Sequence, residues 1–363
     1  MNRLHYMDSL RSILMALGII LHTANIYSED MIWRINSAET STFIAYIQEV
    51  IRLFRMPAFF MVSGFFCVLT LQKYGSKAFV KVRMKRIALP LVVTALTINS
   101  LQALVLHLTG WQPVEFTNYW LTSGWISHLW FLINLLVYFA LAVFLYSFVN
   151  KLSKLIINWL SNLAVKLPMA LVLLVAALSG VGVLALSPLG FPLYSNYFFD
   201  IFHVFTLMKY IPYFLFGALL FNSKELLTKF SNISNTILLL YIAGSLGTLF
   251  LITPNLPESI ATLIIAFSSS VASWSMSAAL FKFFQTFFNK KSDFWLSMAD
   301  FSYTIYLFHQ LIVICLGLIA IELGLPPFAG FITIILLTLL TTMGIHRYFV
   351  RKIPLMRLAF NGK

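Results

Sequence analysis

The chain has 363 residues, of which 60% are hydrophobic and only 10% are charged, and its mean hydropathy is +0.88. A soluble domain carries roughly a quarter charged residues, so this composition excludes a protein that faces water on all sides. The formal net charge of +13 could suggest a nucleic-acid partner, but the basic residues are spread over several short connections, and we expect none.

Stretches of about 20 mainly apolar residues, long enough to cross a bilayer as helices, recur along the chain. We predict about ten transmembrane helices, at 9–27, 51–72, 87–108, 126–149, 167–187, 205–222, 235–252, 260–288, 302–321 and 328–348. No stretch shows the alternation of apolar and polar residues that membrane barrel strands require. The sequence therefore predicts an all-α polytopic bundle in which residues 1–363 form a single integral-membrane domain.

The distribution of basic residues orients this bundle. Most of them fall in alternate connections and in the segment after the last span, at 73–86, 150–166, 224–229, 290–291 and 346–363. The intervening connections contain one basic residue, Arg34. Because cytoplasmic connections are enriched in lysine and arginine, this pattern predicts an even number of spans and both termini in the cytoplasm. The segment 150–166 is expected to be a short amphipathic helix at the cytoplasmic interface.

The first span contains the strongest candidates for function, because ionisable residues are costly in lipid. Asp8 and Arg11 are expected at its inner edge, and His22 in its outer half. Arg11 and His22 are eleven residues apart, which in a helix is about 16 Å and nearly the same face. Asp8 can pair with Arg11 as i, i+3 neighbours. Alternatively, the charged pair only anchors the helix end and His22 caps a neighbouring backbone group.

The second span runs in the opposite direction, so Arg55 enters it at a depth comparable with His22. An arginine there could hold an anionic substrate group or stabilise a developing oxyanion. The alternative is an interfacial arginine that reaches the headgroups or pairs with Glu49, and Arg52 suits that alternative better. Deeper in this span, the small pair Ser63–Gly64 most simply permits close helix contact.

Two further groups are candidates for binding. Arg83 and Arg86 lie three residues apart in KVRMKRI and could grip phosphates, although a cytoplasmic connection would be basic in any case. His128 and Trp130 lie at the outer start of the fourth span, where an aromatic belt is also expected. No histidine or cysteine spacing typical of a metal site occurs, so we expect no catalytic metal.

Several loose motifs occur in a defined order over most of the chain. They are D-S-L-R at 8–11, F-F-M-V-S-G-F at 59–65, R-M-K-R at 83–86, H-L-W-F-L at 128–132, Y-I-P-Y-F-L-F-G at 210–217 and Y-T-I-Y-L-F-H at 303–309. Together with the ten-residue gap between Arg11 and His22, they resemble the acyltransferase-3 family of membrane acyltransferases. The stretches GIILHTANIYS and ISHLWFL resemble the branch of that family associated with adding succinyl groups to osmoregulated periplasmic glucans.

The resemblance implies a reaction between two compartments in the bacterial inner membrane. A cytoplasmic acyl-CoA, with succinyl-CoA favoured and acetyl-CoA as the alternative, donates its acyl group to a hydroxyl of a periplasmic glucan or another extracytoplasmic glycan. No tightly bound cofactor is implied. The Arg-X10-His pattern of the family maps onto Arg11 and His22 in the transmembrane pore. Its RxxR pattern maps onto Arg83 and Arg86 on the CoA side.

The residue roles that we predict follow from combining the resemblance with the span geometry. His22 is the general base, and its near-neutral ordinary pKa suits that task. The other residues predicted at the reaction centre are Arg11, Asp8 and Arg55. The residues predicted to contact substrate are His128, Trp130, Ser63 and His309. Expected partners besides acyl-CoA and the glycan are membrane lipids and either a glucan synthase or a second copy of the chain.

Two other functions would use the same residues. A transporter or flippase for a lipid-linked or anionic solute could line its pathway with Asp8, Arg11, Arg55 and His22. The chain has no internal repeat and no inverted pair of broken spans, which disfavours a secondary transporter. A bundle that only scaffolds a glycan synthase would leave Arg11 and His22 without a role.

Overall fold

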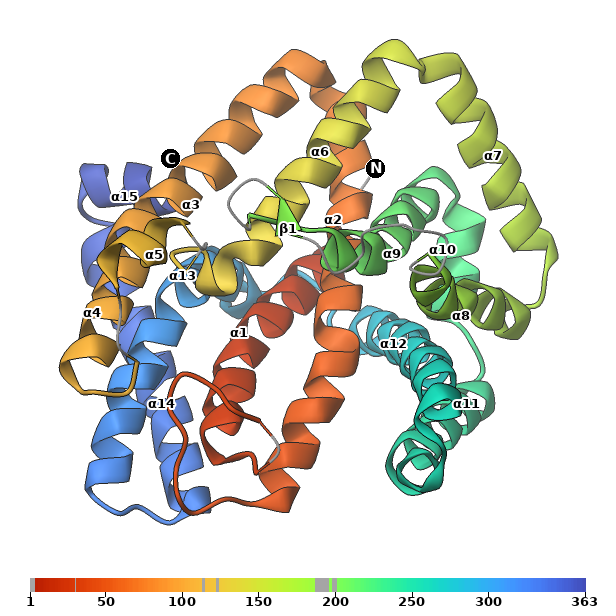
Figure 1. The fold of residues 1–363 in the computed structure, drawn as a ribbon. Helices are drawn as coiled ribbons and strands as arrows, with labels where there is room; N and C mark the ends of the chain where they lie inside the picture. The colour runs from red at the N-terminus through yellow and green to blue at the C-terminus, as the bar shows by residue number, and fades with distance from the viewer. Residues whose placement is uncertain (1–3, 30, 113–114, 122–123, 187–195, 198–200) are drawn as a thin grey trace.

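The computed structural model describes residues 4–29, 31–112, 115–121, 124–186, 196–197 and 201–363. The chain is a bundle of helices (Figure 1). Its α-helices are α1 His5–Tyr27, α2 Thr42–Arg83, α3 Leu89–Thr94, α4 Ser100–Leu108, α5 Phe116–Leu121, α6 Trp130–Phe148, α7 Asn150–Lys166, α8 Met169–Ala185, α9 Val204–Asn222, α10 Lys224–Ser231, α11 Asn235–Gly247, α12 Glu258–Phe287, α13 Asp293–Glu322, α14 Pro327–Ile345 and α15 Pro354–Asn361.

Shorter elements interrupt or join these helices. The π-helical turns are η1 Met84–Ala88, η2 Ala95–Asn99, η4 Thr248–Ile252 and η6 His346–Val350, and the 3-10 turns are η3 Ser127–Leu129 and η5 Thr253–Asn255. Two strands of two residues, β1 Asn196–Tyr197 and β2 Phe202–His203, pair antiparallel. The prediction of an all-α membrane bundle is confirmed.

Eight helical segments of the described chain are long and apolar enough to cross a membrane. One of them, Thr42–Leu108, covers two of the predicted spans, and the predicted span 167–187 corresponds to the shorter helix α8. Position 187, and most of the predicted outer connection 188–204, lie outside the described residues. The number ten and the cytoplasmic location of the termini stay predictions.

The segment Thr42–Leu108 is helical through the basic stretch 73–86 that the sequence suggested as a connection. At about 1.5 Å per residue, 67 residues would extend to roughly 100 Å, far beyond one bilayer. The helix changes direction at Gly75, whose φ of 75° and ψ of 169° are non-helical and suit a residue without a side chain. Figure 1 shows α2 and α3 on either side of this bend.

Close contact between α2 and α9 fixes the centre of the bundle. A Cβ atom on Gly64 would lie 1.9 Å from the Phe214 carbonyl oxygen, and one on Gly217 would lie 2.0 Å from that of Met61. The two backbones therefore touch at both glycines, as small residues permit in membrane helices. The predicted role of Gly64 in close helix contact is confirmed.

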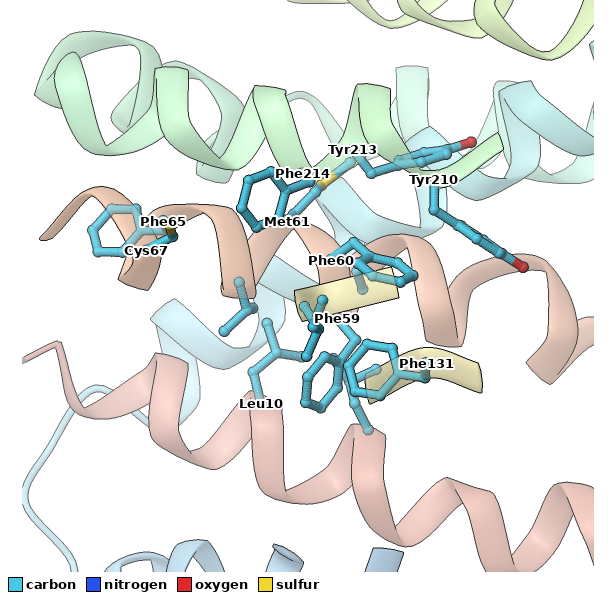
Figure 2. Close-up of a cluster of buried hydrophobic side chains, with 14 of the residues drawn as sticks. Leu10, Phe59, Phe60, Met61, Phe65, Cys67, Phe131, Tyr210, Tyr213 and Phe214 are labelled. Atoms are coloured by element: carbon cyan, nitrogen blue, oxygen red, sulfur yellow. The ribbon is translucent and has the colours of Figure 1, made fainter. Parts of the chain in front are cut away.

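Aromatic side chains fill the space around this contact. Figure 2 shows Phe59 and Phe60 of α2 beside Phe131 of α6, with Tyr210 and Phe214 of α9 on the other side of α2. The Phe60 ring centroid lies 5.0 Å from that of Phe131 and 5.1 Å from that of Tyr210. Such edge-to-face and offset pairs add to the packing that holds helices together where burial in lipid alone supplies little.

Candidate active site

Two cavities in the described part of the bundle are lined by the predicted site residues, except Asp8, which lines neither. The larger, about 600 Å³, is lined by His22, Arg55, His128, Trp130 and His309, and we call it the histidine cavity. The smaller, about 220 Å³, is lined by Arg11, Ser63, Arg83, Arg86 and Lys363, and we call it the arginine cavity. The bundle therefore brings together residues far apart in the sequence, such as His22 and His309, which are 287 positions apart.

Three histidines from three elements meet in the histidine cavity. The ring centroid of His309 on α13 lies 5.2 Å from that of His22 on α1 and 5.3 Å from that of His128 on η3. His309 is fully buried, and only 6% of His128 is exposed. Sequence reasoning singled out His22 among them, whereas the structure makes it one member of a cluster.

The backbone sets the tautomer of His309. Its Nδ1 lies 2.8 Å from the Tyr306 carbonyl oxygen and 3.0 Å from that of Ile305. Both partners only accept hydrogen bonds, so Nδ1 carries a proton and donates it. In the neutral ring, Nε2 therefore presents a lone pair, and no described residue hydrogen-bonds to it.

His128 is held in place by α13. The Tyr306 hydroxyl donates to the His128 carbonyl oxygen at 2.8 Å, and the Gln310 amide donates to Ser127 Oγ at 2.9 Å. Ser127 adopts a φ of 45°, which is uncommon for a residue other than glycine. A strained backbone conformation of this kind persists only where several surrounding contacts hold it in place. Such conformations are frequent at functional sites.

Arg55 reaches across from α2 to the face of α1. Its Nε donates to the Leu14 carbonyl oxygen at 2.9 Å, and only 6% of the residue is exposed. Among the described residues it forms no ion pair, and Glu49, which lines the same cavity, pairs with Arg52 at 2.7 Å. A buried cation without a carboxylate partner is costly, so its guanidinium is available to an anionic or oxyanionic ligand group.

Gly18 is the point at which Arg55 and His309 converge. A Cβ atom built on Gly18 would lie 2.5 Å from Arg55 Nη2 and 3.2 Å from His309 Nε2. Sequence reasoning missed Gly18. Its spacing carried a signal, since it follows Arg11 by seven residues and precedes His22 by four, which places all three on one helical face.

The rest of the histidine cavity is mixed in character. Trp130 lines it and stacks on Tyr210, with ring centroids 5.7 Å apart. Lys209 also lines it and lies 5.7 Å from the centroid of the Tyr210 ring. Arg52 and Glu49 are further lining residues. Aromatic faces beside polar and charged groups are typical of cavities that bind polar organic molecules.

The connection between α1 and α2 covers His22. Trp33 in this connection stacks on His22 with centroids 5.4 Å apart and planes 19° apart. Asn36 holds Trp33, accepting a hydrogen bond from its backbone N–H at 2.9 Å. Burial lowers the pKa of Arg34, whose Nη1 donates to Gln112 Oε1 at 3.0 Å. The described residues of this connection therefore form a hydrogen-bonded cover over His22, and the basic residue among them, Arg34, lines neither cavity.

The arginine cavity concentrates positive charge. Arg83, half-buried, lies over the rings of Phe79 and Phe139 at 4.9 and 4.7 Å from their centroids. Arg86 is exposed on the π-helical turn η1. The predicted pair of Asp8 and Arg11 is present, with 3.7 Å between Oδ1 and Nη2. Stacked guanidiniums keep their hydrogen-bond donors free for phosphate oxygens.

The far end of the described chain contributes to this cavity, which sequence reasoning missed. Lys363 lines it, and its Nζ lies 3.0 Å from Asp300 Oδ1. The other carboxylate oxygen of Asp300 lies 3.1 Å from His346 Nε2. Ser63, predicted to contact substrate, lines the arginine cavity rather than the histidine cavity.

The fold and the two cavities define a multi-helix membrane protein with a buried histidine and arginine site next to a second cavity lined by arginines. Comparison with known families agrees with this class, since the acyltransferase-3 family, described as an acyltransferase domain, matches residues 4–347. The chain belongs to this family of acyltransferases.

The chain is also similar to curated proteins that share one name. Glucans biosynthesis protein C of Escherichia coli O17:K52:H18 (strain UMN026 / ExPEC) is 32% identical over 244 residues, which cover 63% of this chain and 61% of the relative. The proteins of the same name from strains SMS-3-5 and K12 are 33% and 32% identical over 234 residues, or 60% of this chain and 58% of each relative. The alignments thus span about six tenths of the length of these relatives. No solved structure matches the chain.

Proposed function

We propose that the chain transfers an acyl group from acyl-CoA to a hydroxyl of a glycan on the opposite side of the bacterial inner membrane. The observation that carries this proposal is the pairing of an arginine-rich cavity with a histidine-rich one in a single bundle. Phosphates of CoA suit the guanidiniums of Arg83 and Arg86. Proton transfer from a hydroxyl suits the imidazole of His22.

In the proposed reaction, His22 takes the proton of the acceptor hydroxyl as its oxygen attacks the thioester carbonyl carbon. The tetrahedral oxyanion that forms is stabilised by Arg55, which has no acidic partner among the described residues. The carbon–sulfur bond then breaks, the ester is released, and the CoA thiolate takes up the proton from the His22 imidazolium. His309 and His128 border the same space and contact the substrates.

Succinyl is the acyl group that we favour over acetyl. Arg52, Arg55 and Lys209 all line the histidine cavity, against Glu49 as the acidic lining residue. The free carboxylate of a succinyl group needs such a cationic partner. The relatives named glucans biosynthesis protein C support a glucan as the acceptor.

Mass spectrometry of periplasmic glycans tests this proposal. We expect cells with the protein to carry a succinyl mass increment on glucan, and cells with His22→Ala to lose it, with a decrease in rate of about 10²- to 10⁴-fold in a purified assay. Membrane insertion measured in parallel serves as the control. Full activity of an inserted His22→Ala protein would refute the role of His22, and an acetyl increment would refute succinyl.

A further inference from the structure

Three side chains line both cavities: Met15 of α1, Phe59 of α2 and Phe131 of α6. They therefore stand where the arginine cavity and the histidine cavity meet, and we call them the neck. The three residues are 6%, 5% and 2% exposed. Figure 2 shows the side chains of Phe59 and Phe131 beside each other. Their rings meet edge to face, with centroids 4.7 Å apart and planes 86° apart.

The position of Met15 on α1 places the neck between the two proposed ends of the reaction. Met15 is four residues from Arg11 and seven from His22, or about 6 Å and 10 Å along the helix axis. Arg55 lies on the far side, bonded to the carbonyl oxygen of Leu14, the neighbour of Met15. A donor whose phosphates rest on the arginines can present its thioester to His22 only by passing its acyl end through the neck.

We propose that the neck sets the size of the acyl group that this chain transfers, an inference that rests on the proposed acyl transfer. Protein interiors are close-packed, so two rings in edge-to-face contact yield little room to a long or branched chain. Met15 is unbranched and adaptable, so it is the neck residue that moves aside for a small group. An anionic acyl group has a guanidinium on each side of the passage, Arg11 before it and Arg55 after it.

The chain contains a matched pair of residues for testing this inference. Phe59 and Phe60 are adjacent, both are buried, and both rings contact Phe131 edge to face. Phe59 lines both the histidine cavity and the arginine cavity, and Phe60 lines neither of them. Replacing either with leucine removes a ring from the same cluster, but only Phe59→Leu widens the neck.

The experiment measures transfer from succinyl-CoA, acetyl-CoA and hexanoyl-CoA by the full chain in proteoliposomes. We expect Phe59→Leu to raise the ratio of hexanoyl to succinyl transfer by roughly tenfold, the range in which pockets discriminate by a few methylene groups. Phe60→Leu is expected to keep the ratio of the unsubstituted protein. Met15→Ala, which leaves the aromatic cluster intact, is a second widening variant that should shift the ratio in the same direction.

The outcomes separate the neck from the proposed function. An unsubstituted protein that transfers short acyl groups, combined with an unchanged ratio in Phe59→Leu and Met15→Ala, would refute the neck alone. An equal shift in Phe59→Leu and Phe60→Leu would also refute it, because general loosening of the cluster would then explain the effect. Absence of transfer from every donor by the unsubstituted protein would refute both proposals.

Discussion

Gly18 shows how a residue without a side chain can control this site. The Arg55 guanidinium occupies the space where a side chain on Gly18 would begin, and His309 Nε2 lies in tight contact with that space. Arg55 is anchored to the same turn of α1 through the Leu14 carbonyl oxygen. Any group added at Gly18 must therefore displace the guanidinium that we propose as the oxyanion partner.

Gly18→Ala is expected to lower kcat by about 10- to 100-fold, because misplacement of a catalytic group by about 1 Å has effects of that size. Alanine is a better helix former than glycine, so membrane insertion and yield should be retained. The measurement is acyl transfer at saturating donor and acceptor. Gly244→Ala on α11 is the control, since a Cβ atom there meets no atom within 4 Å. Equal rates for the two variants would contradict this role of Gly18.

The residues of the site were predictable from the sequence to different degrees. Arg11, His22 and Arg55 stand out because a charge or an imidazole in an apolar span is costly and therefore informative. The meeting of His22 with His128 and His309 was not predictable, because it depends on how three elements far apart in the chain pack together. Helical spacing describes one element at a time and carries no information on such contacts.

At the scale of elements, the stretch between the second and third spans was predicted incompletely. The basic residues of 73–86 predict a cytoplasmic connection, whereas the structure shows a segment that is helical up to Arg83 and π-helical from Met84 to Ala88. Single π-helical turns inserted in longer helices are rare and often mark functional sites. A π-helical turn contains more residues than an α-helical turn, so a hydrophobic pattern that assumes 3.6 residues per turn does not predict it.

This π-helical turn offers a test of donor binding. Arg83→Ala combined with Arg86→Ala should weaken acyl-CoA binding by about 10- to 100-fold, since a hydrogen bond to a charged group contributes roughly 1.5–3 kcal/mol. Lys85→Ala is the matched control, because Lys85 is exposed on the same turn and does not line the arginine cavity. Binding is measured by calorimetry on the purified protein. Equal affinity in both variants would assign the arginines to membrane orientation alone.

At the scale of the whole molecule, the position of the histidine cavity can be compared with the predicted orientation of the chain in the membrane. The connection between α1 and α2 and that between α13 and α14 lie at the same edge of the bundle, the lower edge in Figure 1. Both were predicted to be extracytoplasmic from the placement of basic residues. The α1–α2 connection also contains Trp33, which covers His22. The inferred acceptor side and the face with few basic residues therefore coincide.

This arrangement predicts that acyl-CoA and the glycan must be supplied on opposite sides of the membrane. In proteoliposomes with a single orientation of the protein, we expect transfer only when acyl-CoA is supplied on the face of Arg86 and the glycan on the opposite face. The physical reason is that the donor phosphates are too highly charged to cross the neck, whereas an acyl group on its thioester arm can reach His22. Orientation is determined by labelling Lys85→Cys with a membrane-impermeant maleimide, since Lys85 is exposed. Equal transfer with both substrates on one face would show that the two cavities serve one compartment, and would overturn the crossing of the bilayer while leaving acyl transfer intact.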